Sequence, residues 1–293
     1  MYSATAKKPL GLDERFAFPN LYQVSWPHTF LSTEAASTRL TRSFLPLTRP
    51  FDNVRQSWTM PNEDELAIAT LTLRSPYVGG LFPQRIEHYD RYLTFHEVPP
   101  QEVEEWRNGF LHFLKKLTWK YQKPLILKSP PHTARIRLLL DLFPDARFVH
   151  IHRDPYTVFQ STLHMVRRTF RLTQLQKSDS VDLEARTLRV YREMHDSFFD
   201  ERSLISSGHI HELCFADLEQ DPVGQVRQIY ETLALPDFAQ AEPRLKEYVD
   251  STAGYKKNEF PALQSDLRNR IASEWQQSFD EWHYPVAGNS DGE

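Results

Sequence analysis

Two cations stand at equivalent places in the chain, each after a short apolar run and before a proline-initiated helix. Lys128 ends the run PLILK, and Arg153 ends the run RFVHIHR. If both runs are parallel strands, these side chains meet beyond the carboxyl edge of a sheet, where helix N-termini favour anions. Ser161 follows about two turns into a helix that Asp154 would cap. The pattern indicates either an anion-binding site or two solvated charges at strand ends.

The elements that would position these residues alternate between strand and helix. Apolar β-rich runs at 124–128, 147–153 and 209–215 predict strands, and 132–143 and 154–173 predict helices. Strands and helices that alternate over short loops indicate a right-handed βαβ unit in a parallel sheet. We therefore expect an α/β fold in which helix outweighs strand by about two to one or more.

The composition narrows the class of protein. A length of 293 residues is enough for one large domain or two modest ones, and we expect a single domain over 1–293 with a polar tail at 286–293. The net charge of −4 argues against a general nucleic-acid binder, and the one cysteine, Cys214, excludes an intrachain disulfide and a thiolate metal cluster. No apolar run reaches the ~18 residues of a membrane span, and no signal peptide is recognisable. We expect a soluble, cytoplasmic protein.

One long stretch carries a family resemblance. LKSPPHTARIRLLLDLFPDARFVHIHRDPYTVFQST closely resembles the corresponding part of the bacterial-type sulfotransferase family, which uses 3′-phosphoadenosine-5′-phosphosulfate (PAPS). Shorter similar segments are PNEDELAI, ELCFADLEQDPVGQVRQIYETLALP, GYKKNEF and FDEWHYP. The resemblance covers roughly residues 12–285. It implies a P-loop-like parallel β-sheet flanked by helices.

The resemblance also implies a reaction and a donor site. Arg153 and Ser161 fit the family's R-x7-S pattern, which binds the 3′-phosphate of PAPS. The implied reaction transfers a sulfuryl group from PAPS to a hydroxyl or amine of a small-molecule, lipid or carbohydrate acceptor, without a metal. His150 and His152 share one face of a strand, but no third ligand follows at a suggestive spacing, so we expect no metal site.

Sulfuryl transfer needs a cation and a base. Lys128 is our candidate to stabilise charge on the bridging phosphate oxygen or on the transferred group, and to bind the donor. The base needs a carboxylate or an imidazole, and the candidates are Glu63, Glu65, His28 and His132, with Glu63 first. Carboxylates in a first helical turn also favour the helix dipole, which is the alternative explanation for this acidic cluster.

The N-terminal part departs from the family pattern. In the family, a first strand ends in a loop such as RSGTT that holds the 5′-phosphosulfate, and the next helix runs into a segment like LDERFAFPN. Here that segment stands at 12–20, after MYSATAKKPLG alone. We therefore expect the first strand and its phosphate loop to be absent from this chain.

The sequence is consistent with two hypotheses for the function. The chain is either a truncated form of an active sulfotransferase or an inactive remnant that keeps only the 3′-phosphate half-site. A nucleoside or sugar kinase is disfavoured, because no GxxxxGK[ST] motif is present. The aromatic and acidic segments 18–30 and 51–90 either line an acceptor pocket or fill a core. The acceptor and the oligomeric state are not predicted.

Overall fold

The computed structural model describes residues 10–41, 56–177, 181–252 and 260–286. It is a helix-rich α/β structure around a small parallel sheet of two strands. The sequence segments MYSATAKKP, GYKKNE and the polar tail from residue 287 lie outside the described residues. No helix in the described ranges is long and apolar enough to cross a membrane.

Two of the predicted strands form a parallel pair, but this pair differs from the predicted βαβ unit, which joined 124–128 to 147–153. Strand β1 (Phe148–His152) and strand β2 (Ile210–Cys214) run parallel, in a register that pairs Phe148 with Ile210 and His152 with Cys214. Their carboxyl ends therefore lie at one edge of the sheet. Both strands match the predicted runs at 147–153 and 209–215.

The predicted strand at 124–128 is wrong in its extent. Leu125 forms only an isolated parallel bridge with Ala17, in which the N–H groups of Ala17 and Ile126 donate at 2.9 and 2.8 Å to Pro124 O and Ala17 O. Proline has no N–H to donate to a ladder, and Pro124 and Pro19 flank the two sides of this bridge. The pairing therefore stops after one bridge.

The helices have the following bounds in chain order. They are α2 (Leu21–Ser25), α3 (Phe30–Leu40), α4 (Glu65–Thr72), α5 (Val78–Leu81), η2 (Pro83–Arg85), α6 (Ile86–Asp90), α7 (Pro100–Tyr121), η3 (Pro130–Ala134), α8 (Ile136–Leu142), α9 (Pro155–Thr173), α10 (Leu183–Glu201), η4 (Arg202–Leu204), α11 (Phe215–Gln220), α12 (Pro222–Thr232), α13 (Phe238–Thr252), α14 (Ser265–Glu274) and α15 (Gln276–Trp282). The predicted helix at 132–143 is thus divided into a 3-10 turn and α8.

Two Asp-Pro dipeptides start helices, the first of them as the sequence predicts. The Asp154 carboxylate caps α9 by accepting a 2.7 Å hydrogen bond from the N–H of Thr157, and Pro155 occupies the first helical position. Asp221 caps α12 in the same way, with Gly224 N–H as donor at 2.9 Å. An aspartate satisfies an unpaired N–H of the first turn, and proline there loses no hydrogen bond.

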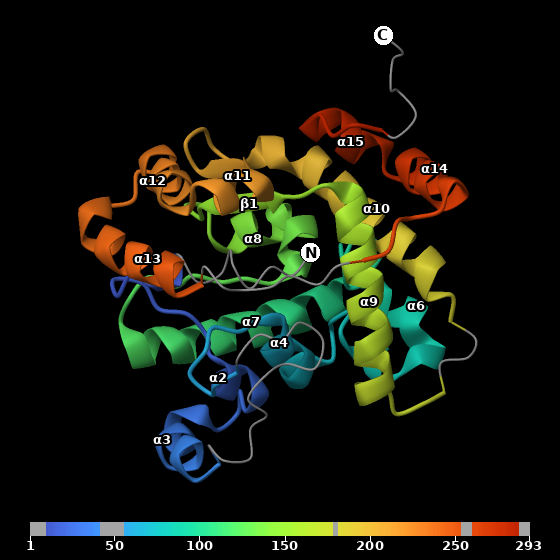
Figure 1. Cartoon of the computed structure of the whole chain (residues 1–293). Helices are drawn as coiled ribbons and strands as arrows, with labels where there is room; N and C mark the ends of the chain where they lie inside the picture. The colour runs from blue at the N-terminus through green and yellow to red at the C-terminus, as the bar shows by residue number, and fades with distance from the viewer. Residues whose placement is uncertain (1–9, 42–55, 178–180, 253–259, 287–293) are drawn as a thin grey trace.

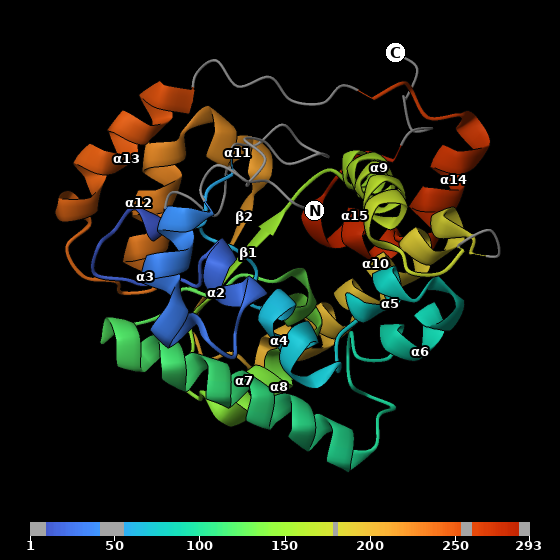
Figure 2. The same ribbon diagram turned by 90° about the horizontal axis from the view of Figure 1, so that it is seen from below.

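The helices surround the sheet on both sides. In Figure 2, α11, α12 and α13 lie on one side of β1 and β2, and α9, α10, α14 and α15 lie on the other. In Figure 1, the long helix α7 runs across the molecule below β1. It buries the aromatic face of Trp106, Phe110 and Phe113 against α4 and α3.

Buried histidines lie between aromatic rings on the α10 side of β1. The ring of His150 stacks on Phe198, with centroids 4.0 Å apart, and on Trp282 at 5.3 Å. The ring of His195 lies next to it, at 6.0 Å. Burial lowers the pKa of His150 well below its usual range and lowers that of His195 to about 3. Both rings are therefore neutral in the folded protein.

From the sequence, we considered His150 and His152 as metal ligands and expected no metal site. In the part of the chain that the structure describes, no group of three His, Cys, Asp or Glu side chains is arranged to hold a metal ion. The neighbours of His150 are aromatic, so its environment is that of a core residue.

We expect the stability to fall on mild acidification. The unfolded chain protonates His150 and His195 near pH 6.5, whereas the folded protein does so only at much lower pH. The free energy of unfolding is therefore fully present above about pH 6.5, and below it drops by about 1.4 kcal/mol per pH unit for each histidine. Urea unfolding at a series of pH values from about 7 to 5 measures this slope.

The variant His150→Phe should reduce that slope by about a third, because His152, whose pKa burial lowers to about 4, contributes to it alongside His150 and His195, and phenylalanine can stack in place of the imidazole ring. The matched control is His112→Phe, at an exposed position of α7. A slope that is equal in His150→Phe and in the wild-type protein would contradict the assignment.

Candidate functional site

The acidic segment before and at the start of α4 faces the segment from Lys128 through η3. Three consecutive carboxylates each meet a basic side chain. The outer pair joins Glu63 Oε1 to Lys128 Nζ at 2.6 Å, and the middle pair joins Asp64 Oδ2 to His132 Nε2 at 2.7 Å. The inner pair joins Glu65 Oε2 to Arg135 Nη1 at 2.7 Å. The two segments are thus fixed against each other at three points.

The inner pair is fully buried. The Arg135 guanidinium donates to both oxygens of Glu65, at 2.7 and 3.1 Å, and neither side chain has exposed surface. Arg135 Nε also donates to the carbonyl oxygen of Leu93 at 3.1 Å, and Arg135 Nη2 donates to that of Tyr92 at 2.5 Å. A buried ion pair is tolerated only when hydrogen bonds satisfy its other polar atoms, and these two carbonyls supply them.

The middle pair holds both the backbone and the ring of the facing segment. Asp64 Oδ1 accepts from the backbone N–H of Lys128 at 3.1 Å, while Oδ2 bonds to the His132 ring. Full burial tends to raise the pKa of Asp64, but the charge and hydrogen bonds of His132, with a bond from Ser129, lower it overall. The carboxylate is therefore ionised. The Ser129 hydroxyl also accepts from the N–H of Glu65 at 2.9 Å.

The outer pair is the one that solvent reaches. The Lys128 side chain is 33% exposed, whereas His132 is 15% exposed and Arg135 is completely buried. The second oxygen of Glu63 accepts a 2.5 Å hydrogen bond from the Tyr77 hydroxyl. A carboxylate and an ammonium group thus lie together at the outer end of an otherwise buried network, where solvent reaches mainly the ammonium group of Lys128.

The other two predicted residues lie at the start of α9. Arg153 follows β1, and its guanidinium lies 4.8 Å from the ring centroid of Phe215, which directly follows β2. No carboxylate of the described residues forms an ion pair with it. Ser161 lies two turns into α9 and donates at 3.1 Å to the carbonyl of Val158. Its hydroxyl can rotate toward a ligand, because serine has one movable donor.

The predicted residues thus fall into two groups. Lys128, Glu63 and His132 belong to the paired segments, where Glu63 bonds to Lys128 and His132 bonds to Asp64. Arg153 and Ser161 belong to the first turns after β1. A strand end and a helix start position the second group, as the spacing predicts. The orientation of the first group comes from the contact between two distant segments.

Sequence reasoning missed Asp64, Tyr77 and Arg135. The spacing of basic residues at 128, 132 and 135 opposite three consecutive acids was a usable signal, since about one turn of helix or 3-10 helix separates them. No sequence signal marks Tyr77, because its contact with Glu63 depends on how the chain folds after α4.

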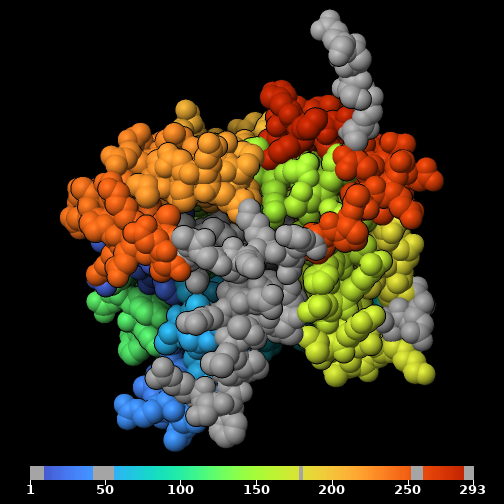
Figure 3. All heavy atoms as spheres, viewed as in Figure 1, coloured from blue at the N-terminus to red at the C-terminus, as the bar shows by residue number. Residues whose placement is uncertain are grey.

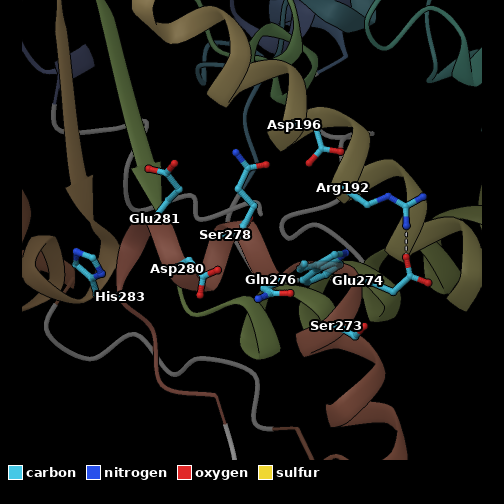
Figure 4. A pocket seen from close by; sticks show the side chains of 11 residues that line it. Arg192, Asp196, Ser273, Glu274, Gln276, Ser278, Asp280, Glu281 and His283 are labelled. Carbon is cyan, nitrogen blue, oxygen red and sulfur yellow. Dashed lines mark hydrogen bonds and ion pairs between the residues drawn. The ribbon is translucent and has the colours of Figure 1, made fainter.

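A separate polar hollow lies on the outer side of α10, α14 and α15 (Figure 4). Its lining carries both signs of charge, and the Arg192 guanidinium is paired there with Glu274. None of the predicted site residues lines this hollow. It therefore adds nothing to the candidate site described above.

Comparison with known proteins identifies the family of this chain. The model of a sulfotransferase family matches residues 37–240. The chain is 34% identical over 275 residues to the omega-hydroxy-beta-dihydromenaquinone-9 sulfotransferases Stf3 of Mycobacterium bovis and Mycobacterium tuberculosis. The matched part is 94% of this chain and 70% of those proteins.

Two solved structures have the same fold. The crystal structure of sulfotransferase STF9 from Mycobacterium avium superposes with a TM-score of 0.77 at 20% identity, over 97% of this chain and 75% of that chain. The structure of sulfotransferase STF1 from Mycobacterium tuberculosis H37Rv gives 0.61 at 17% identity, over 92% and 73%. On the family match and the 34% identical relatives, the chain belongs to the sulfotransferase family.

Proposed function

We propose that the protein transfers a sulfuryl group from PAPS to an acceptor hydroxyl or amine, without a metal ion. The observation that carries this proposal is the outer pair, in which Glu63 and Lys128 lie 2.6 Å apart at the open end of a buried network. Family membership supports the reaction class. The single domain and the cytoplasmic location expected from the sequence belong to the same proposal.

On the donor side, the start of α9 binds the 3′-phosphate. Arg153 offers a planar fork of N–H donors, Ser161 offers a hydroxyl, and the helix N-terminus adds partial positive charge. Lys128 stabilises the negative charge that develops on the bridging phosphate oxygen when its bond to sulfur breaks. These three residues form the donor site.

On the acceptor side, Glu63 accepts the proton of the attacking hydroxyl. The oxygen of the acceptor forms the new bond to sulfur, and adenosine 3′,5′-bisphosphate leaves with the electrons of the broken bond. Tyr77 and Lys128 hold the two oxygens of Glu63 in place before the substrate binds. A carboxylate that is oriented in this way can act as a general base.

His132 is the alternative base. Its Nε2 bonds to the buried Asp64, and its Nδ1 is buried without a hydrogen-bond partner in the described part of the chain. An aspartate that orients an imidazole is a known arrangement for proton transfer. The position of Glu63 beside Lys128, the most exposed side chain of the three pairs, favours Glu63 as the base, with His132 in a positioning role.

The acceptor class that we favour is a lipid that carries a hydroxyl group. The support is the 34% identity to proteins named as sulfotransferases of a hydroxylated menaquinone, a quinone with a long apolar chain. Small polar alcohols and carbohydrates are the other classes. The alternative function, a remnant that binds adenosine 3′,5′-bisphosphate without transferring sulfate, stays open as well.

A transfer assay tests the proposed function. Labelled PAPS is offered with a hydroxylated quinol, a water-soluble primary alcohol and a sugar, and labelled product is counted. We expect transfer to the quinol. A thermal shift with adenosine 3′,5′-bisphosphate but no transfer to any acceptor would favour the remnant, and neither signal would contradict both functions.

Arg153→Ala should weaken the binding of adenosine 3′,5′-bisphosphate by about 10- to 100-fold, because hydrogen bonds to a charged phosphate are lost. Isothermal titration calorimetry measures the affinity. The matched control is Arg147→Ala, which removes an exposed arginine just before the same strand, where it contacts the Ala234 carbonyl. An unchanged affinity in Arg153→Ala would refute the donor site.

Glu63→Gln should lower kcat by about 10²- to 10⁴-fold with little change in the KM for PAPS, because it removes the base and keeps the shape. His132→Asn and the exposed α7 control Glu104→Gln are measured alongside. If His132→Asn retains less activity than Glu63→Gln, the two roles are reversed.

Arg135→Met should lower the free energy of unfolding by about 3–5 kcal/mol, since it leaves the Glu65 carboxylate buried and unpaired. The double variant Arg135→Met/Glu65→Leu should recover at least half of that loss, because it removes the unpaired charge as well. Urea unfolding measures both values. Arg270→Met, which breaks the exposed pair with Glu184, should cost less than about 1 kcal/mol. A small loss in Arg135→Met would contradict the importance of the inner pair.

A further inference from the structure

We propose that the C-terminal end of α9, together with the end of α5, docks on an anionic membrane surface. We call this surface the α9 tip. Its residues are Leu81, Arg167, Arg168, Arg171, Leu172 and Leu175. Figure 1 shows this end of α9 at the edge of the molecule, pointing away from β1. In Figure 3 the same segment forms part of the outer surface at the lower right.

The apolar part of the tip is made of three leucines. The side chains of Leu172 and Leu175 are 62% and 70% exposed, and Leu81 is 37% exposed. The chain turns back after α9, so that the N–H of Leu175 donates at 2.8 Å to the carbonyl of Leu81. A single exposed leucine needs no explanation, but a group of them at the end of a helix indicates a contact surface.

The polar part of the tip is basic. Arg167, Arg168 and Arg171 are exposed, and residues 155–177 contain no aspartate or glutamate. Arg168 precedes Leu172 by four residues on α9, so these two share one face of the helix, and Leu175 follows just beyond the end of the helix. This basic patch stands out in a chain with a net charge of −4. A basic amphipathic helix is typical of an anionic membrane surface, where arginine side chains extend to the head groups.

The location of the tip favours a membrane over a protein partner. Tyr77, which bonds to Glu63, directly precedes α5, and α5 ends at Leu81 about 6 Å further along its axis. A bilayer bound at the tip would therefore lie close to the proposed base. This step depends on the proposed lipid acceptor. An acidic protein groove could bind the same charges but would not deliver a lipid to Glu63.

Vesicle co-sedimentation tests the tip directly. The full chain, without donor or acceptor, is mixed with vesicles of phosphatidylcholine alone or with phosphatidylglycerol added. We expect binding to the anionic vesicles, weakening as salt is raised, and little binding to the neutral ones. Arg167→Gln/Arg168→Gln/Arg171→Gln should reduce the partition coefficient by about 100-fold, because each of the three lost charges reduces it by about fivefold. Leu172→Ser/Leu175→Ser should reduce it by about tenfold.

The matched control removes three exposed arginines from other elements. Arg137→Gln/Arg244→Gln/Arg270→Gln takes the same charge from α8, α13 and α14. We expect it to keep at least a third of the wild-type partition coefficient. Thermal unfolding of each variant confirms that it is folded.

Three outcomes would overturn the proposal. In the first, the tip variants bind vesicles with the partition coefficient of the wild-type protein. In the second, the control variant loses as much vesicle binding as the tip variants do. In the third, the tip binds an acidic helical peptide and the protein binds no vesicles. The readout needs no PAPS, so it stands apart from a failure of the proposed function. If transfer occurs, the tip variants should lose rate on a quinol in vesicles and keep it on a water-soluble alcohol.

Discussion

The buried pair of Glu65 and Arg135 fixes the relation between the two segments that form the site. Both side chains are fully buried, and the guanidinium also holds the carbonyls of Tyr92 and Leu93. Such a pair tolerates little displacement, because a shift would leave charges and carbonyls unpaired in the interior. The start of α4 therefore has one fixed position against η3. The middle and outer pairs form because of that position.

Exposure rises steadily from the inner to the outer pair. Arg135 is inaccessible, His132 is 15% exposed, and Lys128 is 33% exposed. The two inner pairs hold the two segments together, and the outer pair is the most accessible part of the network. A catalytic carboxylate and ammonium need this arrangement, since groups that are oriented before the substrate arrives stabilise a transition state without reorganisation.

The sequence predicted the parts of this site that depend on local rules. The Asp154-Pro155 helix start, the two paired strands and the position of Arg153 all follow from capping, β-rich runs and the carboxyl ends of parallel strands. The strand at 124–128 was wrong, because a single bridge to Ala17 replaces a ladder. Arg135 was missed because a buried guanidinium is rare and its partner lies 70 residues away in the chain. The spacing of the basic residues at 128, 132 and 135 marks them as a set, but a local pattern does not identify partners 65 to 70 residues away.

The central claim is that Glu63 and Lys128 act together on one reacting group. A double-mutant cycle on the rate of sulfuryl transfer tests it, with Glu63→Gln, Lys128→Met and the double variant measured in single turnover. Residues that act as a unit give strongly non-additive effects. The double variant should therefore be barely slower than the slower single variant. Rate losses that multiply, or a wild-type protein that transfers no sulfate to any acceptor, would contradict the account.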